Sequence, residues 1–154
     1  MNSKHYVSKK EMREVMNALS EIGLHINAEA IEISDNKKYK CYYLDGKPII
    51  FMNGKIIPSI YLINAVRPDK NIVKIDAGAE SHIINGSNLF AQGIMEMDQN
   101  IKENEMVFIQ SEKGYFIAVG IAVRSAADIM ADKKGLAIKT IHYPNDEFMK
   151  TFDQ

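Results

Sequence analysis

The chain has 154 residues, of which 46% are apolar and 25% charged, and its net charge is −1. This composition is ordinary for a soluble globular protein, and it excludes an overall basic field that would attract nucleic acid. Residues 1–70 hold eleven Lys and Arg against eight Asp and Glu, a net charge of +3, whereas residues 71–154 hold eight against twelve, a net charge of −4. An anion-binding site in the second part must therefore be local.

The cysteine content and the apolar runs indicate a cytoplasmic protein. Cys41 is the single cysteine, which excludes an internal disulfide and favours a reducing compartment. The N-terminal MNSKHYVSKK lacks the apolar core of a signal peptide. No run approaches the roughly 18 apolar residues of a membrane-spanning helix. We therefore expect no contact with a membrane.

Residues 9–22 have the pattern of an amphipathic helix. Ser8 and Glu11 have the spacing of a capping box, and Gly23 lies where helices commonly end. Apolar residues fall on one face, at positions 12, 15, 16, 19 and 22. The first turns carry three cations, Lys9, Lys10 and Arg13. These oppose the helix dipole, and they form either a solvated helix face or an anion contact.

Residues 29–57 predict a small antiparallel sheet. The alternation in AEAIEIS and the aromatic run KYKCYYL are typical of strands, and the second run ends at Asp45-Gly46. Two further apolar runs flank Asn53-Gly54, a dipeptide that favours a type I′ hairpin because both turn residues need positive φ. Pro58 is expected to open a short helix, PSIYLINAV, as a first-turn proline.

The polar segment RPDKN, residues 67–71, is the predicted domain boundary. Beyond it, short strands alternate with turn signals in NIVKID, EMVFIQ, GYFIAVGIAV and GLAIKTIHY, and SAADIMAD predicts a short helix capped by Ser125. Strands at this spacing favour a barrel or a sandwich. We predict an α+β protein: a small N-terminal α/β domain with an antiparallel sheet over 1–68, a β-barrel over 72–145 and a short tail over 146–154.

The stretch IDAGAESHIINGSNLFAQGI holds three glycines, Gly78, Gly86 and Gly93. Their spacing matches neither the G-x-G-x-x-G fingerprint nor a P-loop, and no Lys-Ser or Lys-Thr follows, so we exclude a nucleotide cradle. From the backbone alone, Gly78 allows a tight turn after the strand at 72–76. Gly86 and Gly93 then bracket one or two helical turns at SNLFAQ.

The same stretch, followed by EMVFIQ, IAVGIAVRSAADI and KKGLAIKTIHY, resembles the PUA domain, the RNA-binding module of pseudouridine synthases and archaeosine transglycosylases. The resemblance covers 72–143 and keeps the PUA order: strand, Gly-Ala turn, Gly-x-Asn helix, Gly-Ile strand, A-V-G strand, S-x-x-D-I helix and Lys-Gly before the last strand. Two positions depart from the common pattern, because Gln92-Gly93 replaces Pro-Gly and Gly86-Ser87-Asn88 replaces Gly-Ala-Asn.

The tail IHYPND, the block AVGIAVRSAADI and the N-terminal SKKE helix resemble one subgroup, that of the human malignant T-cell-amplified protein, ligatin and archaeal relatives. In that subgroup an N-terminal α/β domain precedes the PUA domain. The resemblance implies a non-catalytic RNA-binding protein that acts in translation, in initiation or recycling. Its target would be the small ribosomal subunit, a tRNA acceptor end or both, and a protein partner would dock on the N-terminal domain.

Carried over by position, the resemblance implies RNA-binding residues in three places. They are Gly78 and Ala79 in the first turn; Gly86, Ser87, Asn88, Gln92 and Gly93 on or beside the helix; and Lys139 and His142 on the last strand. Backbone N–H groups at a turn or helix start suit phosphate oxygens, and side-chain amides suit sugar or base edges.

Some polar residues have structural alternatives to an RNA contact. Asn88 is equally suited to bond its own backbone in a turn, and His142 to be half-buried on the last strand. His82 is expected to pack between helix and sheet. Arg124 is expected to pair with Asp128 in preference to a phosphate.

The aromatic pair Tyr115-Phe116 is a possible stacking platform. Alternation within GYFIAV allows only one of the two rings to face outward, and it favours Phe116 for the core.

No catalytic residue, metal site or cofactor is predicted. The histidines at 5, 25, 82 and 142 lie at metal-ligand spacing neither from one another nor from Cys41, and no G-x-S-x-G or H-E-x-x-H occurs. Asp76 at a strand end is more typical of a turn former than of an active-site acid. Two other functions stay open: an accessory RNA-binding subunit in tRNA modification, or a protein-interaction adaptor with a degenerate PUA domain.

Overall fold

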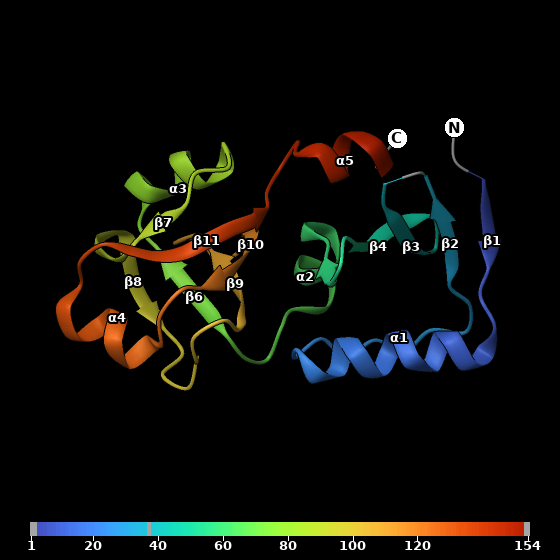
Figure 1. The fold of residues 1–154 in the computed structure, drawn as a ribbon, viewed down its shortest axis with the longest axis horizontal. Helices are drawn as coiled ribbons and strands as arrows, with labels where there is room; N and C mark the ends of the chain where they lie inside the picture. The colour runs from blue at the N-terminus through green and yellow to red at the C-terminus, as the bar shows by residue number, and fades with distance from the viewer. Residues whose placement is uncertain (1–2, 37, 153–154) are drawn as a thin grey trace.

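The computed structural model describes residues 3–36 and 38–152. Two sheets lie at opposite ends of an elongated molecule, with helix α2 (Ile60–Val66) between them (Figure 1). The prediction of an α+β protein, with an antiparallel sheet followed by a barrel, is confirmed. No helix within the described residues is long and apolar enough to cross a membrane.

The N-terminal sheet is antiparallel throughout, in the order β1-β2-β3-β4-β5. Its strands are β1 (Lys4–Tyr6), β2 (Glu32–Asp35), β3 (Lys40–Leu44), β4 (Lys47–Met52) and β5 (Ile56–Pro58). Helix α1 (Lys9–Glu21) covers one face of this sheet, with Val15 and Leu19 buried against it. Ser8 caps the helix by accepting from the Glu11 N–H at 3.1 Å, which confirms the helix predicted at 9–22.

Two local predictions in this region are wrong, the type I′ turn at Asn53-Gly54 and the helix start at Pro58. The two-residue turn with positive φ at both positions is Asp45-Gly46, whereas Gly54 alone has positive φ in a three-residue loop that joins the pair Met52 and Ile56. Pro58 ends strand β5. Ser59 caps helix α2 by accepting from the Leu62 N–H at 3.0 Å.

The C-terminal sheet has six strands in the order β7-β11-β10-β9-β6-β8. They are β6 (Ile72–Ile75), β7 (Leu89–Phe90), β8 (Ile94–Met97), β9 (Met106–Gln110), β10 (Phe116–Ala122) and β11 (Leu136–His142). The two edge strands β7 and β8 are joined by the three-residue 3₁₀ helix η1 (Ala91–Gly93), so the sheet curls into an almost closed barrel. Helix α4 (Ala126–Asp132) begins at Ser125, as predicted.

The glycine-containing stretch folds differently from its prediction. Helix α3 (Ala77–Ile84) starts one residue after Asp76, so Gly78 lies in a first helical turn. Within the segment between Gly86 and Gly93, predicted to form one or two helical turns, Leu89–Phe90 form strand β7 and only Ala91–Gly93 form a helical turn, η1. Leu89 pairs with Ile138, and Phe90 pairs with Leu136, so the strand is fixed by residues that are distant in sequence.

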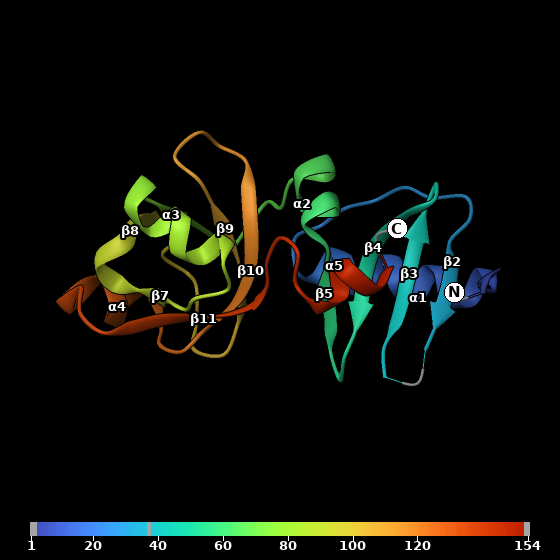
Figure 2. The same ribbon diagram turned by 90° about the horizontal axis from the view of Figure 1, so that it is seen from above.

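The two sheets pack against each other through a common apolar cluster. One apolar cluster joins Leu19, Ile50 and Ile63 with Phe108 and Phe116 of the barrel. Helix α5 (Glu147–Phe152), which follows the barrel in sequence, crosses back to the N-terminal sheet (Figure 2). Its Phe148 and Phe152 pack on the face opposite α1, against Cys41 and Phe51. The C-terminal helix therefore completes the N-terminal core.

Candidate nucleic-acid interface

A groove of about 500 Å³ opens between α3, β7 and η1. It is lined by Asp76, Gly78, Ala79, His82, Ile83, Ser87, Asn88, Leu89, Phe90, Gln92 and Gly93. All of these residues come from one stretch of eighteen, 76–93, so a local segment builds the whole site.

Asp76 and Gly93 set the shape of the groove. The Asp76 carboxylate accepts from the Ala79 N–H at 2.8 Å and thereby caps α3. The Asp76 N–H donates to the Gly93 carbonyl at 3.0 Å, which draws η1 toward the helix. A side chain at Gly93 would place its Cβ 2.7 Å from the Ala79 Cβ, so only glycine allows this approach.

The groove presents polar groups and one exposed ring. The side chains of His82, Asn88 and Gln92 are exposed. Asn88 Oδ1 accepts from the Thr140 N–H on β11 at 3.0 Å, while its Nδ2 makes no hydrogen bond with the part of the chain that is described. Phe90 is 55% exposed. The groove thus offers amide and imidazole groups beside an aromatic face.

Six of the nine predicted RNA-binding residues line this groove: Gly78, Ala79, Ser87, Asn88, Gln92 and Gly93. Lys139 is exposed on β11, the strand that Asn88 contacts through Thr140, but it is not part of the lining. Gly86 has a structural role instead. It has φ of +91°, and a Cβ there would lie 2.7 Å from the Tyr143 ring.

His142, predicted to contact RNA, is fully buried, and this prediction is wrong. Its Nε2 accepts from the Ile60 N–H at the start of α2 at 3.1 Å. Nδ1 therefore carries the proton of the neutral ring and donates to Asp146 Oδ2 at 2.7 Å. The side chain joins the barrel to the N-terminal part and has no face for a ligand.

Asp146 completes this buried joint. Its two oxygens accept from the Tyr143 N–H at 3.1 Å and the Met149 N–H at 3.0 Å, so it also caps α5. Burial alone would raise the pKa of this carboxyl, but the hydrogen bonds from His142 and the two backbone groups outweigh it and lower the pKa.

The structure confirms one of three further predictions about side chains and contradicts the other two. His82, expected to pack between helix and sheet, is exposed in the groove. Arg124 pairs with Asp132 at 3.1 Å and with the Lys134 carbonyl, and the expected pairing with Asp128 is wrong. Phe116 is buried and Tyr115 is 47% exposed, as predicted. Residue types alone did not distinguish His82 from a core histidine.

Comparison with known proteins identifies two family regions in the chain. Residues 71–144 match the PUA domain, and residues 3–65 match a domain of unknown function, DUF1947. A conserved PUA domain protein from Thermoplasma acidophilum, of known structure, is 47% identical over 97% of this chain and 99% of its own, with a TM-score of 0.95. The chain belongs to the PUA-domain protein family. The groove lies within its PUA region.

Relatives of this PUA-domain protein extend beyond one lineage. Uncharacterized protein MJ1432 of Methanocaldococcus jannaschii is 32% identical over 96% of this chain and 95% of its own length. Translation machinery-associated protein 20 of Schizosaccharomyces pombe is 30% identical over 71% of this chain, which spans 65% of that protein. A malignant T-cell-amplified sequence 1 homolog of Drosophila melanogaster is 25% identical over 69% of this chain and 62% of its own. These names confirm the resemblance to the malignant T-cell-amplified subgroup.

Several relatives are enzymes named for tRNA modification, and the chain spans only a small part of each. The tRNA (cytosine(72)-C(5))-methyltransferase of Pyrococcus horikoshii is 26% identical over 88% of this chain, which spans only 37% of that enzyme. Most of the enzyme has no counterpart in this PUA-domain protein. Among residues 3–36 and 38–152, no group of three or more His, Cys, Asp or Glu side chains is placed to hold a metal ion. The match to the PUA domain and the relatives named for translation point to RNA binding.

Proposed function

We propose that this PUA-domain protein acts in translation by binding a single-stranded RNA end in the groove between α3, β7 and η1. The observation that carries the proposal is the groove itself, which gathers His82, Asn88, Gln92 and the exposed Phe90 ring in one concave site. Unpaired bases offer their hydrogen-bonding edges and both faces to such a site, whereas a duplex hides them.

The net negative charge of the barrel favours a local contact with RNA over binding through a broad basic surface. Residues 71–154 carry eight cations against twelve carboxylates, so counterion release cannot dominate binding by the barrel. Lys139 is exposed on the strand that Asn88 contacts, and we propose that it binds a phosphate of the RNA. Hydrogen bonding and stacking then supply most of the affinity, and these depend on an accessible RNA terminus.

The target we propose is the acceptor end of tRNA, ribosomal RNA of the small subunit, or both together, during initiation or recycling. Relatives named for the translation machinery support the process, and a relative named for cytosine 72 of tRNA, near the 3′ end, supports that RNA. A protein partner on the N-terminal sheet domain would complete the assembly.

The test measures binding of the purified chain to small ribosomal subunits, to intact tRNA and to tRNA without its 3′ CCA, each at two salt concentrations. Gln92→Ala removes a groove side chain, and Lys139→Glu reverses the nearby charge. Lys102→Glu is the matched control, because Lys102 is exposed in the segment between β8 and β9 and lies outside the groove lining.

We expect Gln92→Ala and Lys139→Glu each to weaken binding about three- to thirtyfold, the range of one hydrogen bond or phosphate contact. Lys102→Glu should bind as the parent does. If the parent chain binds none of the three RNAs, the proposal is overturned, and a protein-interaction adaptor becomes the better explanation. Stable association with a catalytic chain and none with ribosomes would favour an accessory role in tRNA modification.

A further inference from the structure

Helix α2 and the hairpin between β9 and β10 lie side by side at the joint of the two sheets, and both project from the same edge of the molecule (Figure 2). The Asn64 side chain bonds both backbone groups of Phe116, at 2.8 and 2.9 Å. The Arg67 guanidinium donates to the Gly114 carbonyl at 2.8 Å. These contacts hold the two elements in a fixed relation.

Exposed aromatic rings and cations lie around the contact between α2 and the β9–β10 hairpin. Tyr61 on α2 is 45% exposed, and Tyr115 on the hairpin is 47% exposed. The Lys47 ammonium lies 5.9 Å from the Tyr61 ring centroid, and Lys113 is exposed beside Tyr115. The hairpin turn also carries one carboxylate, Glu112, so cations outnumber anions at this surface.

Arg67 is the unusual residue of the group. Its φ of 55° and ψ of 120° lie in a region that side-chain-bearing residues rarely adopt. Such a conformation costs on the order of 1–3 kcal/mol, persists only where the surrounding structure holds it, and is commonest at functional sites. The guanidinium is held over the Phe116 ring at 5.1 Å and by the Gly114 carbonyl, and it makes no ion pair within the described residues. A strained backbone thus positions an immobilised, unpaired cation at the surface.

We propose that Arg67, Tyr61 and Tyr115 form a second RNA contact, which takes a phosphate on Arg67 and stacks unpaired bases on the tyrosines. Interleaved aromatic rings and cations are the pattern that binds single strands without reading sequence. None of these residues lines the α3 groove. This inference rests on the proposed function: the groove holds the RNA end, and the joint surface engages nucleotides farther along the strand.

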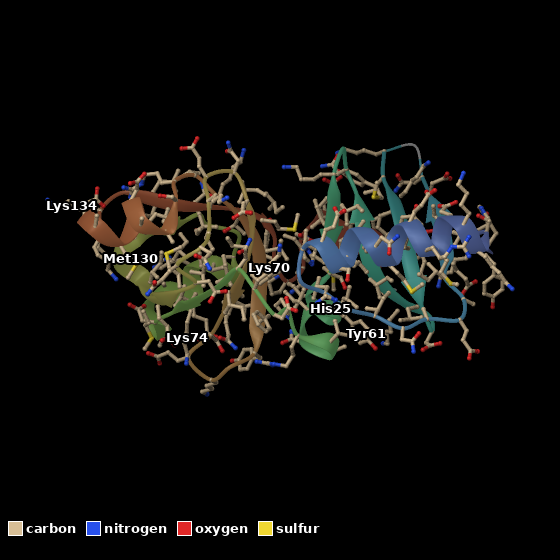
Figure 3. The ribbon with its side chains drawn as sticks, turned by 90° about the horizontal axis from the view of Figure 1, so that it is seen from below. His25, Tyr61, Lys70, Lys74, Met130 and Lys134 are labelled. Carbon is tan, nitrogen blue, oxygen red and sulfur yellow. The ribbon has the colours of Figure 1, made fainter. Side chains whose placement is uncertain are left out.

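The experiment uses two single-stranded RNAs with the 3′-terminal sequence of tRNA, one of about four nucleotides and one of about twelve, lengths at the two ends of the range for a single-strand site. Two variants test the surface. Arg67→Gly removes the cation and suits the positive φ, and Tyr115→Ala removes an exposed ring. Lys134→Ala is the control, because Lys134 lies at the far end of the barrel from Tyr61 (Figure 3). Thermal unfolding of each variant establishes that it is folded.

We expect Tyr115→Ala to bind the longer RNA about five- to fiftyfold more weakly, the value of one stacked base, and Arg67→Gly to bind it about five- to fiftyfold more weakly through the lost phosphate contact. Arg67→Gly should also reduce the slope of log affinity against log salt by about 0.7, as expected for one lost phosphate contact on a single strand. Affinity for the short RNA, and both affinities of Lys134→Ala, should not change.

A second readout reports stacking directly. The chain contains no tryptophan, so Tyr115→Trp introduces a unique fluorophore, which the longer RNA should quench and the short RNA should not. Unchanged affinity and salt slope in Arg67→Gly and Tyr115→Ala, with no quenching, would overturn the second contact while leaving groove binding intact. Loss of all RNA binding in the parent chain would instead overturn the proposed function.

Discussion

Lys139 and His142 lie three residues apart on the same strand, β11, and they occupy opposite environments. Lys139 is exposed on the strand that contacts the groove, whereas His142 is fully buried between α2 and α5. The family resemblance assigned both to RNA. A family motif matched by position therefore predicts where a residue lies in the fold. It does not predict whether the side chain there is exposed to solvent. In this molecule His142 at the end of β11 belongs to the joint, whereas the Lys139 side chain faces solvent.

Replacement of His142 should produce the largest effect. His142→Ala leaves the Ile60 N–H and the Asp146 carboxylate without their buried partner and opens a cavity beside Phe51, whose ring centroid lies 5.1 Å away. The free energy of unfolding should fall by about 3–4 kcal/mol. Chemical denaturation measures it. An undiminished stability would show that the buried joint contributes little.

Asp146→Asn tests the other half of the joint and should cost about 1–2 kcal/mol at neutral pH. The lowered pKa of Asp146 gives the effect a pH dependence. The carboxylate stabilises the fold above the ordinary pKa of 3.8, and this contribution is lost as pH falls through the lower pKa of the folded state. The stability difference between parent and variant should therefore shrink in acid. A difference that stays constant down to pH 2 would contradict this assignment.

Lys139→Ala should have the smallest effect on stability, within about 0.5 kcal/mol, because it removes an exposed side chain. It should instead weaken RNA binding several-fold, in the same assay as Lys139→Glu. His142→Ala, measured at a temperature where it is folded, should bind RNA as the parent does. The reverse pattern would return His142 to the interface and remove Lys139 from it.

The sequence predicted elements whose signals are local. Helix α1 was found because its cap, its apolar face and its terminal glycine all lie within residues 8–23. Strand β1 was missed because three residues carry no periodicity, and it forms through pairing with Glu32–Ser34. The sequence predicts helix at strand β7 for the same reason, since its two residues are defined by a partner strand more than forty residues away.

The position of the groove could be predicted from the sequence better than the exposure of its single side chains. The glycines and the family resemblance point to the stretch 75–94, and every residue that lines the groove falls within 76–93. Accessibility could not be read in the same way. His82 and His142 are both histidines near apolar residues in sequence, and only the tertiary partners of His142, Ile60 and Asp146, distinguish the buried one.

The return of α5 to the N-terminal sheet has a consequence for biogenesis. Phe148 and Phe152 cover Cys41 and Phe51, yet they are synthesised after the whole barrel. During synthesis the N-terminal part of a protein generally folds first. One face of this N-terminal sheet, however, stays uncovered until residues 147–152 have been synthesised. The core of the N-terminal sheet is therefore completed only after the barrel has been synthesised, when α5 packs against the uncovered face.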